Sequence, residues 1–175
     1  GIPPNLISMW VENNELTEIS LAKHHLGDAG IIQLSKSIVA NKSTVECLYL
    51  QENNFGDEGA MGLAQMLKVN ASLKSINLLM NEIGDEGFKA IKIAFEGNEH
   101  LKTVCGIKED EIEKNFSRQD LKPVDGKILA LDLKFNASLK KINLYRNEIG
   151  DEGASAIAKG IQENKNCVLE ELNLG

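Results

Sequence analysis

Pairs of acidic residues inside a repeated Gly-Asp-Glu-Gly string are the most conspicuous candidates for chemistry in this sequence. The pairs are Asp57/Glu58, Asp85/Glu86 and Asp151/Glu152. Paired carboxylates can ligate a metal ion or act as acid and base, but only where they converge on one point. Each repeat displaces its pair along the chain, so we expect these acids to stabilise helix N-termini, where carboxylates accept free backbone N–H groups.

Histidines and cysteines do not form a catalytic or metal-binding pattern. A zinc site needs more ligands at usable spacing than the three histidines and three cysteines offer, and no serine or cysteine stands beside a plausible histidine base. These residues are His24, His25, His100, Cys47, Cys105 and Cys167. Phosphate-binding glycine loops are also missing from the sequence. We therefore predict no catalytic residue, no metal and no small-molecule cofactor, and the protein is not expected to be an enzyme.

The elements that carry these residues repeat along the chain. Residues 73–87 read L-x-x-I-x-L-x-x-N-x-I-G-D-E-G, and the same string returns at 45–59, at 139–153 and more loosely at 16–30. Each copy predicts a short strand, an asparagine turn and the start of a helix flanked by glycine. Repetition at a period of this kind indicates a solenoid, in which each repeat is one strand–helix unit.

Two independent columns of residues fix the register of the repeats. The turn column is His24, Asn53, Asn81, Gln119 and Asn147, and the column at the helix C-termini is Asn41, Asn70, Asn98, Asn136 and Asn164. Both columns have spacings of 29, 28, 38 and 28 residues. Asparagine at a helix C-terminus often adopts the left-handed conformation as a cap, so we expect the second column to do so.

Apolar columns identify the core. Two positions four residues apart give each helix one apolar stripe: Leu34/Ile38, Leu63/Leu67, Ile91/Phe95, Leu129/Leu133 and Ile157/Ile161. Alternating residues give each strand one apolar face: Ile19/Leu21, Leu48/Leu50, Ile76/Leu78 and Ile142/Leu144. Stacked repeats then close a core that no single repeat could bury alone.

This pattern resembles leucine-rich repeats of the ribonuclease-inhibitor type, with about 28 residues per repeat, and is similar to the repeat domains of NOD-like receptors. The resemblance covers nearly the whole chain. It implies an α/β horseshoe solenoid, with parallel strands on the concave face and helices on the convex face.

Residues 1–175 are expected to form a single leucine-rich-repeat domain of about five repeats, with partial repeats at both ends. Residues 1–15 fit the helix of an earlier repeat, and residues 169–175 match the opening of a strand. Terminal repeats normally carry polar caps, and neither end shows one. The chain is therefore interpreted as a fragment of a longer solenoid.

One irregularity interrupts the register, because Leu101 and Leu139 lie 38 residues apart. A charged insertion near residues 105–114 accounts for the difference, and the motif resumes at Phe116 before Pro123 opens a helix through Leu133. Insertions in repeats map to loops, so the segment is either a loop that reaches a partner or, on the favoured interpretation, a surface excursion without function.

Composition excludes several classes of function. The net charge is −7 and only two of the nineteen basic residues are arginines, which argues against a nucleic-acid partner. No apolar stretch is long enough to span a membrane, and no secretion signal opens the chain. The expected location is the cytoplasm, and an association with the cytoskeleton or a cilium is compatible with the resemblance.

Positions between and just after the buried strand residues are predicted to face the concave side and bind a protein partner of unknown identity. Both tyrosines and both arginines of the chain fall in these columns, and Tyr and Arg are enriched at binding hot spots. The predicted site is Tyr49, Gln51, Asn77, Leu79, Met80, Arg118, Asn143, Tyr145 and Arg146. Leu79 and Met80 are expected to add exposed apolar area.

The predicted function is a non-catalytic protein–protein interaction module, as the resemblance to inhibitors, receptor sensor domains and scaffolds implies. The alternative is a GTPase-activating regulator similar to the Ran GTPase-activating protein, which is also built on these repeats. In that case Arg118 or Arg146 would have to reach a bound nucleotide.

Overall fold

The computed structural model describes residues 16–175, and the chain forms two compact units divided in sequence after Lys102. The expected helix in residues 1–15 lies outside the described residues. The first unit contains, in chain order, β1 (Glu18–Ser20), α2 (Gly27–Ala40), β2 (Cys47–Tyr49), α3 (Asp57–Leu67), β3 (Ser75–Asn77) and α4 (Asp85–Glu96). The second contains β4 (Glu113–Asn115), α5 (Pro123–Leu133), β5 (Lys141–Asn143), α6 (Gly150–Glu163) and β6 (Glu171–Asn173).

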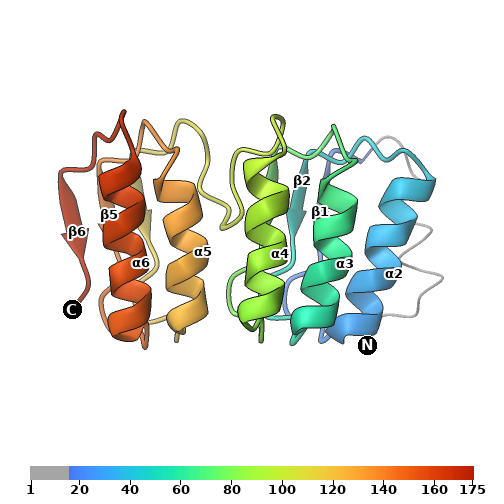
Figure 1. The fold of residues 1–175 in the computed structure, drawn as a ribbon, viewed down its shortest axis with the longest axis horizontal. Helices are drawn as coiled ribbons and strands as arrows, with labels where there is room; N and C mark the ends of the chain where they lie inside the picture. Colours follow the sequence, from blue (N-terminus) through green and yellow to red (C-terminus); the bar gives the residue numbers. More distant parts are fainter. Residues whose placement is uncertain (1–15) are drawn as a thin grey trace. The chain divides into compact units, whose positions relative to one another are not determined.

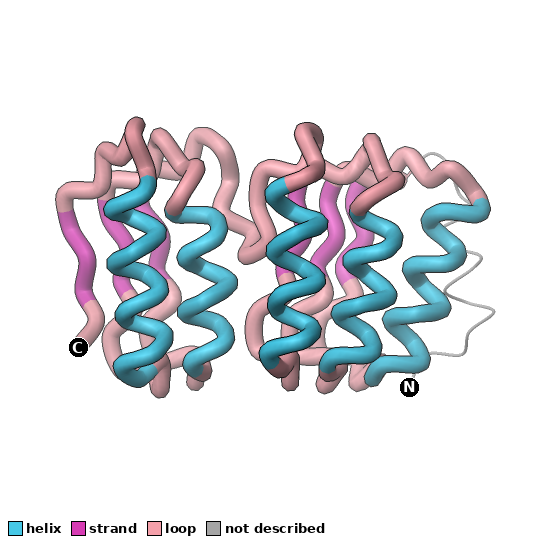
Figure 2. The backbone as a smooth tube through the Cα atoms, in the orientation of Figure 1, coloured by secondary structure: helices cyan, strands magenta, loops and turns pink. Residues whose placement is uncertain are grey.

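Each unit has one layer of strands and one layer of helices (Figures 1 and 2). The strands pair in parallel in the order β1-β2-β3 in the first unit and β4-β5-β6 in the second. Within the first unit α3 packs against both α2 and α4, and within the second α5 packs against α6. The predicted α/β fold class, with parallel strands on one side and helices on the other, is confirmed within each unit.

The predicted apolar columns form the core. The strand pairs Ile19/Leu21, Leu48/Leu50, Ile76/Leu78 and Ile142/Leu144 are all buried. In the sheets Leu48 is in register with Ile19 and Ile76, and Ile142 is in register with Lys114. The helix columns are buried as well, except that Ile161 is only partly covered. Burying such side chains is the main favourable contribution to folding.

The turn asparagines link each repeat to the next through their side chains. Asn81 Oδ1 accepts the Asn53 N–H at 2.8 Å, and Asn81 Nδ2 donates to the carbonyl oxygens of Leu50 and Leu78. Asn53 repeats the arrangement one step earlier and accepts the N–H groups of His24 and Leu26. Buried backbone groups that no strand partner reaches are satisfied in this way, which explains the asparagines at these two turn positions.

The asparagines at the helix C-termini behave differently from the prediction. None of the residues Asn41, Asn70, Asn98, Asn136 and Asn164 adopts the left-handed conformation. Their side chains form hydrogen bonds in the turn instead. Asn98 Oδ1 accepts the Leu101 N–H, and Asn98 Nδ2 donates to the carbonyl of Leu67 in the preceding repeat. The expected cap is therefore wrong in its backbone conformation, because the side chain itself satisfies the free carbonyl and amide groups.

Two aspartates of the Gly-Asp strings, Asp28 and Asp57, each stabilise the N-terminus of the helix in the next repeat. Asp28 Oδ1 accepts the N–H groups of Gly56 and Gly59, at 2.8 and 2.7 Å. Asp57 Oδ1 likewise accepts the N–H groups of Gly84 and Gly87. A Cβ atom on Gly87 would lie 2.6 Å from that carboxylate oxygen, so the second glycine of the string leaves space for the aspartate.

We expect Asp57→Ala to lower the free energy of unfolding by about 1–2 kcal/mol, the usual loss when an N-terminal cap is removed. Glu58→Ala is the matched control. Its carboxylate is exposed in the same helical turn, and the change should stay within about 0.5 kcal/mol. Urea denaturation followed by circular dichroism measures both values, and equal losses would show that the aspartate does not link the two repeats.

The irregular segment is partly internal. Residues 103–105 and Ile107 are buried in the second unit, whereas residues 108–110 are exposed. Neither interpretation of the insertion anticipated this burial. The repeat resumes slightly earlier than predicted, because β4 begins at Glu113, within the predicted insertion, and pairs with β5 in a 28-residue register, Glu113 with Lys141. The helix that opens at Pro123 and ends at Leu133 is also confirmed.

Candidate protein-interaction surface

The predicted site residues are divided between the two units. Tyr49, Gln51, Asn77, Leu79 and Met80 lie at or just after β2 and β3 of the first unit, and Arg118, Asn143, Tyr145 and Arg146 lie in the second. Because successive strand residues point to opposite faces, those beside the buried strand residues face away from the helices. We call these two sheet faces the strand-side surfaces.

Leu79 does not contribute to the strand-side surface. Its side chain is 0% exposed, so the expectation of exposed apolar area at this position is wrong. Strict alternation ends with β3 at Asn77, and Asn77 Oδ1 accepts the Leu79 N–H at 3.1 Å, which curls the chain after the strand. Met80, the next residue, is partly exposed.

Asparagines at the ends of the strands use their side-chain oxygen locally. In the second unit Asn115 Oδ1 accepts the Ser117 N–H, and Asn143 Oδ1 accepts the Tyr145 N–H. An asparagine that bonds two residues ahead stabilises a turn. The Nδ2 groups of Asn115 and Asn143 make no bond to any residue that the structure describes, so their N–H donors are available to a partner.

A hollow of about 370 Å³ lies on the strand-side surface of the second unit. Its lining includes Glu113, Lys141 and Glu171 in addition to the strand asparagines. Lys141 Nζ lies 3.5 Å from Glu113 and 3.8 Å from Glu171, so one lysine is shared by the two carboxylates. The prediction omitted these three residues. Each lies two positions before an asparagine at the end of a strand, so strand alternation places it on the same face as that asparagine.

The residues that precede the turn column adopt a left-handed backbone. Lys23, Glu52, Met80, Arg118 and Arg146 have φ angles between 56° and 64°. Non-glycine residues adopt this conformation rarely and at a cost in energy, so the turn must impose it. In the first unit Lys23 and Glu52 form an ion pair of 2.9 Å along this column.

In the second unit the same column carries two arginines. Both side chains are exposed, and the Arg118 N–H donates to the Tyr145 carbonyl at 3.0 Å, which places the two turns side by side. The Arg146 guanidinium lies 5.3 Å from the centre of the Tyr145 ring. We call Arg118, Tyr145 and Arg146 the arginine–tyrosine cluster. Neither arginine forms an ion pair within residues 16–175.

Tyr49 and Gln51 mark the strand-side surface of the first unit. Both side chains are half-buried. Burial raises the pKa of the Tyr49 phenol, and the charge of Glu18 beside it acts in the same direction. The Gln51 Oε1 atom is buried without a hydrogen-bond donor among the described residues. A buried acceptor without a partner is costly.

Comparison with known proteins adds the family. Residues 12–35, 41–64, 69–92 and 135–158, together more than half of the chain, match a family described as leucine-rich repeat. The chain belongs to the leucine-rich repeat family. The longest stretch without a match, residues 93–134, contains the irregular segment.

Curated relatives confirm the ribonuclease-inhibitor type of repeat. The chain is 28% identical over 162 residues to ribonuclease inhibitor of Sus scrofa, which covers 93% of this chain and 33% of the relative. It is 26% identical over 170 residues to NACHT, LRR and PYD domains-containing protein 5 of Mus musculus, and this match covers 97% of this chain and 14% of the relative. The chain therefore spans a third or less of these relatives' length.

Solved structures support the leucine-rich repeat fold. The actin-binding site 2 of leiomodin-1 aligns with a TM-score of 0.55 at 22% identity, covering 93% of this chain and 87% of that one. The tropomodulin C-terminal domain of Caenorhabditis elegans also aligns with a TM-score of 0.55, at 14% identity, covering 93% of both chains. At these identities the likeness concerns the fold alone.

A buried carboxylate holds the segment that interrupts the leucine-rich repeat pattern. Asp132 of α5 is 2% exposed and accepts hydrogen bonds from the Thr103 hydroxyl, the Val104 N–H at 2.8 Å and the Cys105 thiol at 2.6 Å. Burial raises the pKa of Asp132 to about 6, although these hydrogen bonds oppose the shift. Burial and the nearby carboxylate raise the pKa of Cys105 well above its ordinary value. The cluster is enclosed, so we assign it a structural role.

Two classes of site are missing from the described residues of this leucine-rich repeat chain. Within 16–175 no three residues of the types His, Cys, Asp and Glu gather in a way that could hold a metal ion. In the same range, no helix combines the length and the apolar character needed to cross a membrane.

Proposed function

We propose that this chain is a non-catalytic protein-interaction module that binds a protein partner through its strand-side surfaces. The arginine–tyrosine cluster carries the proposal. Two like charges side by side destabilise a free protein, and no acidic side chain within residues 16–175 pairs with them. Such a pair is reasonable where a partner supplies the negative charge.

The partner's contacting group is an acidic side chain, as the chemistry of the cluster suggests. A guanidinium binds a carboxylate through two parallel hydrogen bonds, which gives both energy and orientation. The Tyr145 ring adds a rigid apolar surface beside the charge. The free amide groups of Asn115 and Asn143 would donate to acceptors further along the same segment.

The experiment is affinity capture with the wild-type chain, identification of the captured proteins by mass spectrometry and titration calorimetry with the purified partner. Tyr145→Ala should weaken binding at least about tenfold, since removal of a hot-spot tyrosine typically costs about 2 kcal/mol or more. The melting temperature should change little, because the ring is half-exposed.

Lys159→Ala on the helix side of the same unit is the matched control. Its side chain is 75% exposed, and the change should leave affinity as it is. If Lys159→Ala weakens binding and Tyr145→Ala does not, the partner contacts the helices and the strand-side proposal is wrong.

The alternative, a GTPase-activating regulator, remains a prediction. An arginine that reaches a bound nucleotide can accelerate hydrolysis by several orders of magnitude, and both arginines of the cluster are exposed. Single-turnover GTP hydrolysis with a panel of small GTPases tests this alternative. Acceleration that disappears in Arg118→Ala or Arg146→Ala would favour it over simple binding.

A cytoplasmic location is part of the same proposal. None of the three cysteines forms a disulfide, and Cys105 is buried as a thiol, which agrees with a reducing compartment. The net charge of −7 argues against nucleic acid as the partner. The activity and partners of a whole protein that contains this chain belong to the proposal as well.

A further inference from the structure

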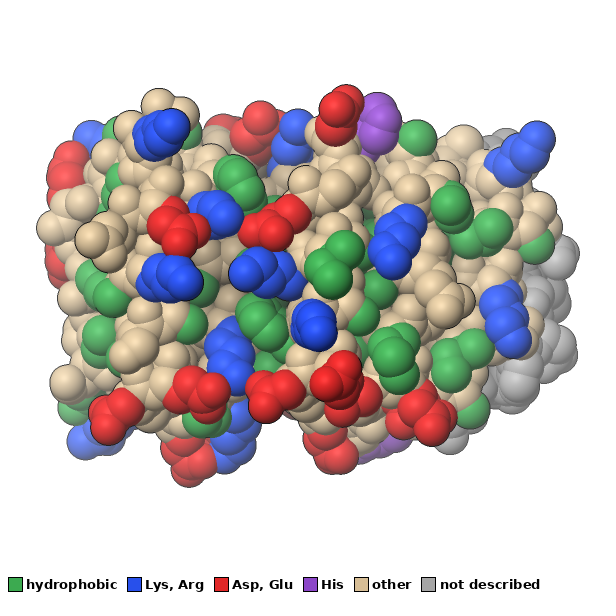
Figure 3. Space-filling view, viewed as in Figure 1, with side chains coloured by type: hydrophobic (Ala, Val, Ile, Leu, Met, Phe, Trp, Pro, Cys, Tyr) green, Lys and Arg blue, Asp and Glu red, His purple; other side chains and the backbone are tan. Residues whose placement is uncertain are grey.

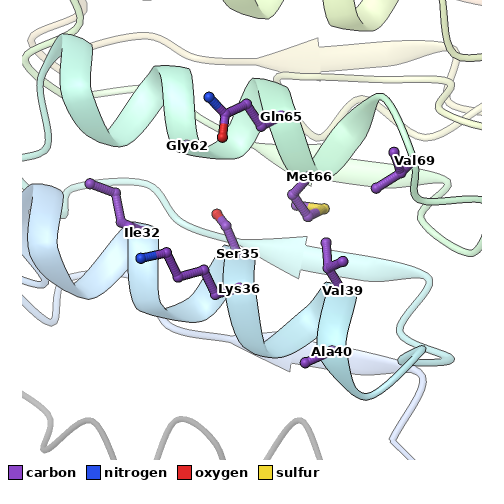
Figure 4. A pocket seen from close by; sticks show the side chains of 9 residues that line it. All are labelled: Ile32, Ser35, Lys36, Val39, Ala40, Gly62, Gln65, Met66 and Val69. Carbon is purple, nitrogen blue, oxygen red and sulfur yellow. The ribbon is translucent and has the colours of Figure 1, made fainter.

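A groove runs between α2 and α3 on the helix side of the first unit. Its first part has a volume of about 340 Å³, and its walls come from both helices (Figure 4). A second hollow of about 640 Å³ continues toward residues 42–46 and 70–72. Val39 and Val69 line both hollows, so the two form one continuous groove.

In the wall of this groove α3 has a glycine, Gly62, where it faces α2. Repeats aligned on the Gly-Asp string place Gln33, Ala90 and Ala156 at the position of Gly62. A Cβ atom on Gly62 would lie only 3.0 Å from Ile32 Cγ1. Glycine inside a helix is unfavourable by about 0.5–1 kcal/mol relative to alanine, and at this position it lets α3 lie close to Ile32 of α2.

Apolar side chains along this groove are exposed. Val69 is 68% exposed, Val39 is 45% exposed and Met61, on the outer face of α3, is 41% exposed. Single apolar residues on a surface are ordinary, but neighbouring ones that line a groove are typical of a binding site. The apolar lining of the groove also includes Ile32 and Met66.

Charge along the groove is positive. Lys36 and Lys42 line it, and Lys68 is exposed at the end of α3. Glu46 is the one acidic residue in the lining of either hollow, and it pairs with Lys74 at 2.8 Å. The acids of α2 and α3 lie in the first turns, and Figure 3 shows lysines and apolar side chains above them.

We propose that this groove docks an acidic amphipathic helix of a protein partner. An amphipathic helix can lay its apolar face into such a groove, and acidic residues beside that face would meet the three lysines. From Ile32 to Lys42 the groove follows about 15 Å of helix axis, which corresponds to a partner stretch of about ten residues. This surface is separate from the strand-side surfaces.

The test uses a fluorescent peptide of about 18 residues, long enough to form a helix, with leucines at i, i+3, i+4 and i+7 and glutamates elsewhere. Fluorescence anisotropy with the full 175-residue chain should show saturable binding that weakens with salt. A peptide of the same composition in scrambled order, and one with lysine in place of glutamate, should not bind.

Two variants locate the binding. Val69→Asp and Lys36→Glu should each weaken it at least about fivefold, because they place negative charge against the acidic peptide. Both side chains are exposed, so circular dichroism and the melting temperature should stay unchanged. Lys159→Glu on α6 is the matched control and should bind as the wild type does.

The double variant Arg118→Ala/Arg146→Ala separates this proposal from the strand-side one. Full affinity of the double variant for the peptide supports the groove. If the double variant loses affinity and Val69→Asp does not, the peptide binds the arginine–tyrosine cluster and the groove proposal is overturned.

Other occupants would also overturn it. Binding to phosphatidylserine vesicles without peptide binding would indicate a lipid surface. Dimerisation in sedimentation that Val69→Asp abolishes would indicate a second copy of the chain. No saturable binding of the acidic amphipathic peptide would show that the groove does not take such a helix.

Discussion

Asn81→Ala is expected to lower the free energy of unfolding by about 3–5 kcal/mol, since several buried backbone groups lose their partner at once and each costs about 1–3 kcal/mol. The side chain is 6% exposed and bonds the Asn53 N–H and the carbonyl oxygens of Leu50, Leu78 and Leu79. Chemical denaturation measures the difference in the free energy of unfolding, with one slope of free energy against denaturant concentration fitted to both the variant and the wild type.

Asn115→Ala is the control for that experiment. This asparagine is exposed and its side chain bonds one N–H group, that of Ser117, which water can reach. The loss should stay below about 0.5 kcal/mol. Similar losses for Asn81→Ala and Asn115→Ala would mean that the turn amides do not hold neighbouring repeats together.

The stability of the second unit should depend on pH through Asp132. In the folded chain burial raises its pKa to about 6, whereas an unfolded aspartate has a pKa near 3.9. The folded state therefore binds the proton more tightly. The stabilisation from this group is fully present below about pH 4 and is lost as pH rises through 6, which amounts to about 2–3 kcal/mol.

The difference between the wild type and Asp132→Asn isolates this effect, because all other carboxylates titrate equally in both proteins. From pH 4 to pH 7 the free energy of unfolding of the wild type should fall by about 2–3 kcal/mol relative to the variant. Parallel pH profiles for the two proteins would show that Asp132 has an ordinary pKa in the folded chain.

The sequence by itself determined the repeat and its register. A strand residue such as Leu48 and a helix residue such as Leu63 must be buried because their columns recur at one period and one face of each element is apolar. Asn53 and Asn81 in the turn column followed from the same periodicity. These features are local or repeat regularly, so residue type and spacing suffice to predict them.

The predicted strand-side surface was recovered less completely. Tyr145 lies where alternation places it, two residues beyond Asn143, whereas Arg118 and Arg146 lie in the turns that follow the strands. Alternation failed at Leu79, which is buried although Tyr145 at the corresponding position is only half-buried. Both residues follow a strand that ends at an asparagine two positions earlier, so spacing alone does not show which of them is covered.

Contacts between repeats were decided by the tertiary structure alone. Asp57 accepts the N–H groups of Gly84 and Gly87 in the following repeat, although the sequence suggested a cap for its own helix. Asp132 in α5 holds Thr103 and Cys105, 29 and 27 residues earlier in the chain. A hydrogen bond between distant residues leaves no periodic signal, since it depends on how the elements pack and on which buried groups would otherwise lack a partner.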